Sequence, residues 1–241
     1  MSLKKMLLYN LFAVLIFAVS VSLTVVFSRP PEIPQAPATI QEASDESWAF
    51  FLINEKNPLP ENYEPELMLV TEDFFLDARC AEYARNMLTA AENDGVILNV
   101  VSAYRSRQRQ SENFDNYVAR LMYEGMSEAD AILFTAAQIA KPGASEHNAG
   151  LALDILSTDW FDYNNDITDE FDRTPEFRWL AANSWKYGFI LRYPKGKEEI
   201  TGIIYEPWHF RYVGIDVAEQ IFNSGFTLDE YIELYPPTRL T

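Results

Sequence analysis

Two short segments, far apart in the sequence, carry the residues best suited to chemistry. The first is Ser-Glu-His-Asn-Ala-Gly-Leu-Ala-Leu-Asp at positions 145–154, and the second is Glu-Pro-Trp-His at positions 206–209. The chain has only 2 histidines, one in each segment, and each lies close to a carboxylate. A catalytic zinc site needs about three nitrogen or oxygen ligands, an open position for water, and a base that takes the proton of that water. The two segments together contain enough groups for such a site.

His147, Asp154 and His209 are the candidate metal ligands, which leaves Glu206 as the candidate base. Two neutral imidazoles and one carboxylate suit zinc, because the nitrogen donors are borderline soft and the site keeps a net positive charge. A lone histidine is more often structural, but two histidines beside carboxylates favour a metal. Asp154 strengthens the prediction, because a carboxylate inside an apolar segment is costly unless it is paired or bound to a metal.

Arg105 and Trp208 are the further residues that could face a substrate. Attack of water on a carbonyl produces an oxyanion, which needs a cation or hydrogen-bond donors already in place. Arg105 is a candidate, because a guanidinium group stays charged and can grip a carboxylate with two hydrogen bonds. A surface salt bridge is the alternative for this arginine. Trp208 is either a core residue or a wall of the substrate cleft.

The elements that must position these residues follow from hydrophobic periodicity and from helix start and stop signals. Helices are predicted at residues 73–93, 107–124, 127–140, 174–187, 215–223 and 227–234. Strands are predicted at residues 50–54, 96–101, 151–156, 189–193 and 201–205, with a turn at residues 57–60 and a hairpin-like connection at 195–199. Helices and strands mix without a regular βαβ alternation, so we expect an α+β fold.

The composition fits one folded domain that does not bind nucleic acid. The 241 residues are 48% hydrophobic and 14% aromatic, which is enough for one full core. A net charge of −17 leaves no basic surface to meet phosphates. The acidic residues of segment 157–173 are interpreted as a solvated loop, since they lack the glycine and terminal glutamate of a calcium-binding loop. The single cysteine, Cys80, is predicted to be a small core residue rather than a catalytic thiol.

The N-terminal segment predicts a location outside the cytoplasm. Lys4 and Lys5 precede an uncharged, mostly apolar run at residues 6–27, which as a helix is long enough to cross a bilayer. The lysines place the start of the run in the cytoplasm. The run is long for a signal peptide and ends at a poor cleavage site, so we favour an uncleaved single-pass membrane anchor over a cleaved signal peptide.

Three regions are therefore expected along the chain. Residues 1–28 form the membrane anchor or signal peptide, and residues 29–47 form a proline-rich linker that holds the domain off the membrane. Residues 48–241 form the domain that carries the two segments.

The pattern Ser145-x-His147-x-x-Gly150-x-x-x-Asp154, followed by Glu-Pro-Trp-His, resembles the signature of the VanY-type D-alanyl-D-alanine carboxypeptidases. These enzymes belong to a metallopeptidase superfamily that also includes lysostaphin-type enzymes and the hedgehog signalling domain. The resemblance runs from about residue 50 to about residue 231. It departs from the family at Ala103, where a glycine is usual, and at Arg107, where a tyrosine is usual. Neither residue is expected to touch a metal ligand, but Arg107 is expected to add a charge near the substrate pocket and so to influence the substrate preference.

The resemblance implies the fold, the cofactor and the role of each site residue. The fold would have a small, mostly antiparallel central sheet flanked by helices, as in the hedgehog and D-Ala-D-Ala peptidase domains. One Zn²⁺ would be held by the residues that match His147, Asp154 and His209, with Glu206 as the catalytic base. The substrate's terminal carboxylate or the developing oxyanion would be held by Arg105, Gln110 and Ser145, with Trp208 beside the substrate.

These implications lead to an expected function and two alternatives. The expected activity is removal of the C-terminal D-alanine from peptidoglycan stem peptides by metal-activated water. An L,D-carboxypeptidase acting on the tetrapeptide stem would use the same residues. A zinc-bearing module that binds cell-wall peptide without cutting it is the alternative from another class, and it predicts that the base or the arginine is missing. Glu206 and Arg105 are both present, which favours an enzyme.

Overall fold

The computed structural model describes residues 47–157 and 167–237, all within one compact unit that spans Ala43–Thr241. The predicted anchor and nearly all of the predicted linker lie outside the described residues, and so does most of the predicted acidic loop. Among the described residues, the helices are too short or too polar for any of them to cross a bilayer.

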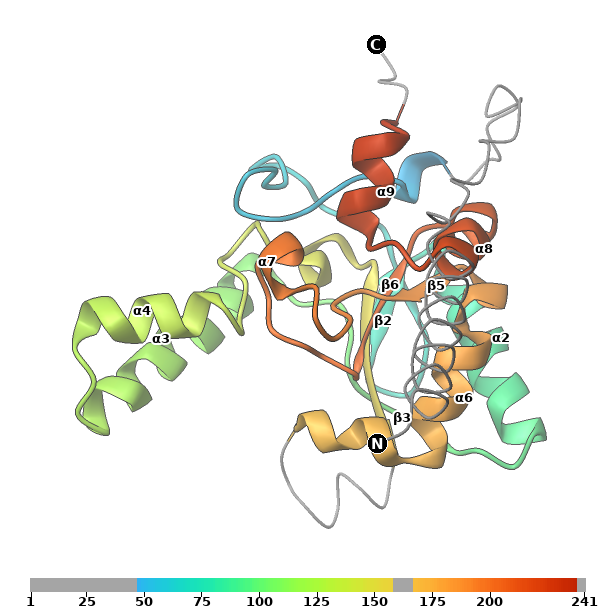
Figure 1. The fold of residues 1–241 in the computed structure, drawn as a ribbon, viewed down its shortest axis with the longest axis horizontal. Helices are drawn as coiled ribbons and strands as arrows, with labels where there is room; N and C mark the ends of the chain where they lie inside the picture. Colours follow the sequence, from blue (N-terminus) through green and yellow to red (C-terminus); the bar gives the residue numbers. More distant parts are fainter. Residues whose placement is uncertain (1–46, 158–166, 238–241) are drawn as a thin grey trace, which may run out of the picture. The chain divides into compact units, whose positions relative to one another are not determined.

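A four-stranded antiparallel sheet forms the centre of the domain (Figure 1). Its strands, in spatial order, are β3 (Leu98–Ser102), β4 (Ala152–Ser157), β6 (His209–Tyr212) and β5 (Phe189–Leu191). Every residue of β4 and β6 is buried. Strand β4 is mostly apolar, as expected for a strand at the centre of the sheet, whereas β6 carries the polar side chains His209 and Arg211 at buried positions.

Helices cover the sheet and extend from it. Helices α2 (Ala81–Asn93), α6 (Pro175–Asn183) and α8 (Ile215–Ser224) contact β3, β4 and β5 in turn. Helices α3 (Arg107–Tyr123) and α4 (Glu128–Ala136) pack against each other and project away from the sheet (Figure 1). The short helices α7 (Glu198–Thr201) and α9 (Leu228–Leu234) contact each other. The 3-10 helices are η1 (Ser47–Ala49), η2 (Glu146–Ala149), η3 (Asp169–Arg173) and η4 (Ser184–Tyr187).

The α+β class and most of the predicted helices are confirmed. Ser127, Thr174 and Thr227 each cap a helix, because the side-chain oxygen accepts the backbone N–H three residues later. Thr227 and Glu230 form a complete capping box at the start of α9. Two helices are shorter than predicted: α4 ends at Ala136, and the last turn of the helix predicted at 174–187 is the 3-10 helix η4.

The predicted helix at 73–93 is wrong over its first part. Strand β2 (Phe75–Asp77) occupies this region and pairs with β1 (Leu67–Leu69), which the sequence pattern did not indicate. The carboxylate of Asp77 accepts hydrogen bonds from the backbone N–H and the side chain of Arg79. This local turn stops the strand, so the helix begins only after Cys80. Cys80 is fully buried in the core, as predicted.

Two predicted strands are also wrong. Residues 50–54 form no strand, and an isolated bridge between Asn54 and Asn57 closes a turn there, in which the Asn54 side chain accepts two backbone N–H groups. Residues 195–205 contain helix α7 and irregular backbone in place of a hairpin-like connection and a strand. The backbone N–H of Ile204 donates to the carbonyl of Ala137, near the end of α4, instead of to a sheet neighbour. The strand that was expected there starts later, at His209.

A candidate zinc site between strands β4 and β6

The register of the central sheet brings Asp154 and His209 together. They are directly paired residues of the antiparallel strands β4 and β6. The nearest approach between their side chains is 3.2 Å, from His209 Nδ1 to Asp154 Oδ1. Both residues are buried, at 5% and 4% exposure. Two candidate ligands 55 positions apart in the sequence thus become neighbours through one strand pair.

His147 reaches the same point from the 3-10 helix η2. This helix ends at Gly150, whose φ of +67° is the left-handed conformation that glycine adopts without strain. A Cβ at this position would also lie 2.7 Å from the backbone nitrogen of Asp77. The glycine of the His147-x-x-Gly150 spacing therefore lets the chain turn from η2 into β4 against the neighbouring backbone.

The segment after β3 fixes the orientation of His147. The β3–β4 register shifts between Val100 and Ser102, which is an irregularity of the β-bulge type. Just beyond it, the carbonyl of Ala103 accepts a hydrogen bond of 2.6 Å from His147 Nδ1. The backbone N–H of Arg105 donates to the carbonyl of His147, and the side chain of Asn148 donates to the carbonyl of Arg105. The histidine is thus held by backbone contacts on both sides.

The proton position of His147 leaves a lone pair of this histidine at the centre of the site. A carbonyl oxygen only accepts, so Nδ1 of His147 carries the proton and Nε2 of the neutral ring is a bare acceptor. This nitrogen lies 3.3 Å from Asp154 Oδ2 and has no hydrogen-bond partner among the described residues. Two acceptors that face each other in a buried site repel one another, and a cation bound between them would remove this repulsion.

His209 presents its other ring nitrogen to the same point. Its Nε2 lies 3.1 Å from the carboxylate of Glu146, and its Nδ1 faces Asp154 and, at 3.6 Å, Glu206 Oε2. One nitrogen from each histidine and the carboxylate of Asp154 lie within 4.8 Å of one another. Ligands about 2.0–2.2 Å from a tetrahedral zinc ion are themselves roughly 3.3–3.6 Å apart. The distances of 3.3 Å from His147 Nε2 to Asp154 Oδ2 and 3.2 Å from His209 Nδ1 to Asp154 Oδ1 are close to this spacing. The structure thus brings His147, Asp154 and His209 together as one potential metal site.

The pKa values follow from burial and from the charges in the site. Burial is the main reason why the pKa of His147 falls to about 4, and the charge of Arg105 lowers it further. Burial alone would also lower the pKa of His209, but hydrogen bonds to Asp154 and Glu146 outweigh it and raise the value to about 9. Burial opposes ionisation of Asp154, yet contacts with the two histidines hold its pKa well below its usual range.

Glu206 is placed beside the three potential ligands as a separate acid–base group. Its backbone N–H donates to the carbonyl of Tyr193, and its own carbonyl accepts from the N–H of His209 in a tight turn. Burial raises the pKa of Glu206 to about 8, and the negative charges of Asp154 and Glu146 add to this effect. A carboxyl group in this range can both take and release a proton near neutral pH.

A cavity of about 620 Å³ opens onto these residues. Its lining includes the predicted substrate-binding side chains Arg105, Gln110, Ser145 and Trp208. Nε of Arg105 and Oε1 of Gln110 are buried without a hydrogen-bond partner among the described residues. The side-chain nitrogen of Gln110 donates to the carbonyl of Ala140, which fixes the amide at the cavity wall. The structure thus places every predicted substrate residue at the cavity that contains the candidate ligands.

The two departures from the family pattern have different environments. Ala103 is buried and acts through its carbonyl on His147, a contact that does not depend on its side chain. Arg107 donates from its guanidinium group to the carbonyls of Leu59 and Pro60, and it does not line the 620 Å³ cavity. The charge of Arg107, which was expected near the substrate, therefore lies against the carbonyls of Leu59 and Pro60 instead of in the cavity.

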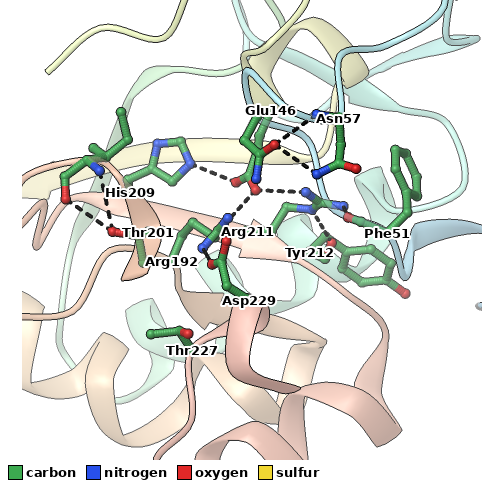
Figure 2. A network of polar contacts seen from close by, with 12 residues as sticks. Phe51, Asn57, Glu146, Arg192, Thr201, His209, Arg211, Tyr212, Thr227 and Asp229 are labelled. Carbon is green, nitrogen blue, oxygen red and sulfur yellow. Dashed lines mark hydrogen bonds and ion pairs between the residues drawn. The ribbon is translucent and has the colours of Figure 1, made fainter. Parts of the chain in front are cut away.

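Sequence reasoning missed Glu146 and Tyr193 as parts of the site. Glu146 is buried, and its carboxylate lies between Arg192, Arg211 and His209 (Figure 2). Tyr193 lines the cavity, with its ring centroid 4.9 Å from that of His209. Glu146 stands next to the predicted ligand His147. A glutamate within an otherwise buried segment is the signal that could have indicated its part in the site. Its partners come from strand regions distant in the sequence, which no local pattern indicates.

Comparison with known proteins places this site in a family. A sequence model described as "VanY: D-alanyl-D-alanine carboxypeptidase" matches residues 73–215. A D-alanyl-D-alanine carboxypeptidase of Enterococcus faecalis is 39% identical over 196 residues, which cover 81% of this chain and 70% of the relative.

Two solved structures resemble the domain closely. A zinc complex of a mutant vancomycin-resistance D,D-pentapeptidase VanY has a TM-score of 0.68 at 39% identity, covering 77% of this chain and 99% of that structure. The L,D-carboxypeptidase LdcB has a TM-score of 0.65 at 37% identity, covering 76% of this chain and 84% of that structure.

The fold, the His-Asp-His donor set and the adjoining carboxyl group define a zinc metallocarboxypeptidase. Within that class, the chain belongs to the VanY family of D-alanyl-D-alanine carboxypeptidases. Zinc is accordingly its cofactor.

Proposed function

We propose that this protein removes the C-terminal D-alanine from peptidoglycan stem peptides as a zinc-dependent D-alanyl-D-alanine carboxypeptidase. The observation that carries the proposal is the set of acceptors of His147, Asp154 and His209 facing one point in a cavity, with Glu206 beside them. Bound zinc supplies a Lewis acid, which polarises the scissile carbonyl and makes the attacking water more acidic. The remaining chemistry belongs to residues of the chain.

Glu206 is the residue placed to move the proton. As a carboxylate it takes a proton from the attacking water, and it then delivers that proton to the nitrogen of the departing D-alanine. Glu206 Oε2 lies 3.6 Å from His209 Nδ1, so Glu206 is next to the potential metal ligands but is not one of the three. One group can serve both steps, because the water loses a proton and the leaving amine gains one.

Arg105 is the cation placed to recognise the end of the peptide. Its Nη2 lies 3.6 Å from Asp154 Oδ2, and its side chain is 21% exposed at the edge of the site. A guanidinium group with an unpartnered buried Nε can donate to the terminal carboxylate or to the oxyanion that forms on attack. Gln110 and Ser145 line the same cavity and would complete the pocket for the terminal residue.

The direct test is digestion of a synthetic stem pentapeptide ending in D-Ala-D-Ala by the purified full chain. We expect release of one D-alanine per peptide, loss of release with a chelator, and recovery with added zinc. Failure to release D-alanine by a zinc-loaded, folded protein would overturn the proposal. The tetrapeptide serves as the comparison, because its cleavage in preference to the pentapeptide would identify an L,D-carboxypeptidase. Binding of both peptides without cleavage would identify a wall-binding module.

We also propose that residues 6–27 anchor the protein in a bacterial cell membrane and that the catalytic domain lies outside the cytoplasm. The support is the apolar run behind two lysines, together with a substrate that belongs to the cell wall. In intact protoplasts, added protease should digest the domain. In protoplasts that receive no protease, the protein should stay with the washed membranes. Protection from protease would contradict this location. Recovery of a soluble protein lacking its first 28 residues would identify a cleaved signal peptide instead.

A further inference from the structure

The carboxylate of Glu146 lies at the centre of a buried network of charges behind the zinc site (Figure 2). Its Oε1 accepts hydrogen bonds from Arg192 at 2.7 Å and from Arg211 at 2.8 Å. Its Oε2 lies 3.1 Å from Nε2 of His209. The Glu146 side chain is fully buried. All three contacts therefore form away from solvent.

We propose that Glu146 is a positioning residue that fixes the tautomer and the ring orientation of His209 for metal binding. An ionised carboxylate can only accept, so its contact with His209 requires the proton on Nε2. The lone pair of the neutral ring is then on Nδ1, which faces Asp154 Oδ1 at 3.2 Å. If His209 were held in the opposite tautomer, with its proton on Nδ1, it would turn an N–H group toward the metal.

The two histidines would then carry their protons on opposite nitrogens. Ala103 places the proton of His147 on Nδ1, so His147 presents Nε2 to the site. Glu146 places the proton of His209 on Nε2, so His209 presents Nδ1. Groups that hydrogen-bond to the far nitrogen of a ligand histidine orient the ring and raise its basicity toward the metal. A backbone carbonyl and a carboxylate fill this role on the two sides of one site.

The two arginines hold Glu146 in place. Arg211 of β6 is fully buried and also donates to the carbonyls of Ala49, Phe51 and Tyr212. Arg192 follows β5 and also donates to the carboxylate of Asp229 on α9. Both arginines bind the same oxygen of Glu146, which leaves the other oxygen for His209. The orientation of the carboxylate is therefore set by elements outside the metal site.

The variant Glu146→Gln separates positioning from charge neutralisation. A glutamine has one oxygen, and the two arginine donors hold that oxygen on their side. The amide nitrogen then faces His209 Nε2 and can only donate, which favours the wrong histidine tautomer. We expect the zinc affinity, measured by chelator competition on the full chain, to fall about 10–100-fold.

Asp229→Asn is the matched control, because it also removes one carboxylate that pairs with a buried arginine, Arg192, but leaves the contact between Glu146 and His209 intact. Its stability should fall and its zinc affinity should stay within about threefold of wild type, well short of the loss expected when the hydrogen-bond partner of a ligand histidine is displaced. A folded Glu146→Gln variant with wild-type zinc affinity would overturn the proposal. So would equal losses of affinity in the two variants, because they would indicate a general effect of lost charge.

A second measurement needs no variant and covers the case in which Glu146→Gln does not fold. The chain has 2 histidines, so ring-nitrogen NMR of histidine-labelled, metal-loaded protein resolves only their four nitrogens. We expect a proton on Nδ1 of His147 and on Nε2 of His209. A proton on Nδ1 of His209 in the metal-loaded protein would overturn the proposal. The inference rests on the metal site of the proposed function, and the readouts distinguish the two: a wild-type chain that binds no zinc contradicts the site itself.

Discussion

Asp154 and His209 face each other across paired strands, with 3.2 Å between Asp154 Oδ1 and His209 Nδ1. Because side chains alternate faces along a strand, a shift of one residue in this register would turn one ligand to the opposite face of the sheet. The zinc site is thus a property of the β4–β6 pairing, to which η2 adds His147.

Glu206→Gln should abolish proton transfer and leave the metal site in place. The amide cannot accept a proton from water, so kcat should fall by about 10²–10⁴, the usual contribution of a positioned acid–base group. Zinc content should remain near one per chain, because Glu206 is not one of the three potential ligands. Steady-state kinetics and metal analysis check both points, with Glu170→Gln at an exposed surface position as control. Unchanged turnover in a zinc-loaded Glu206→Gln protein would rule out the assigned role.

Arg105→Lys should weaken recognition of the terminal carboxylate. Lysine keeps the charge but loses the two-pronged geometry, and a lost charged hydrogen bond of about 1.5–3 kcal/mol corresponds to a roughly 10–150-fold lower kcat/KM. A peptide with a C-terminal amide is the control substrate, because it lacks the carboxylate. Wild type and variant should cleave the amide at similarly low rates. If the variant lost equal activity on both peptides, Arg105 would act elsewhere than on the carboxylate.

Gly150→Ala should cost more stability than Gly202→Ala. Both glycines have left-handed backbone, with φ of +67° and +76°, so each substitution carries a strain of about 1–2 kcal/mol. Only at position 150 would the new Cβ also approach a backbone atom, Asp77 N, at 2.7 Å, whereas Gly202 has open space. Urea unfolding should show the larger loss for Gly150→Ala, together with weaker zinc binding because η2 must shift. Equal losses would remove the argument for close packing at Gly150.

Arg107→Tyr, which restores the residue usual in the family, should leave substrate choice unchanged. The Arg107 guanidinium contacts the carbonyls of Leu59 and Pro60 and does not line the cavity. The ratio of kcat/KM for pentapeptide and tetrapeptide should therefore match that of wild type. The free energy of unfolding should fall by about 1–2 kcal/mol as these hydrogen bonds are lost. A changed ratio would show that Arg107 affects the substrate after all.

The sequence predicted the parts of the site that depend on residue type and local spacing. The ligands, the base and the cavity residues stand in two short segments and one strand end, and the helix caps at Ser127, Thr174 and Thr227 follow a local rule. The strand predicted at residues 201–205 is absent, because β-branched side chains suit a strand and a cavity wall equally well. Ile203 and Ile204 line the cavity.

The contacts made by distant segments could not be predicted in this way. Glu146 is stabilised by Arg192 and Arg211, which come from different strand regions, and their meeting depends on the sheet order β3-β4-β6-β5. The carbonyl of Ala103 reaches His147 only because the register of β3 shifts at its end. Such backbone contacts depend on register, which hydrophobic periodicity does not specify.

The central claim is tested most directly by paired digestion of stem pentapeptide and tetrapeptide with the full chain, measured with zinc, with chelator and after zinc is restored. The expected result is release of D-alanine from the pentapeptide, loss of this activity with chelator, and its recovery on addition of zinc. Release from the pentapeptide that persists in a protein shown to be free of metal would contradict the zinc mechanism, and cleavage of the tetrapeptide alone would contradict the D,D-specificity.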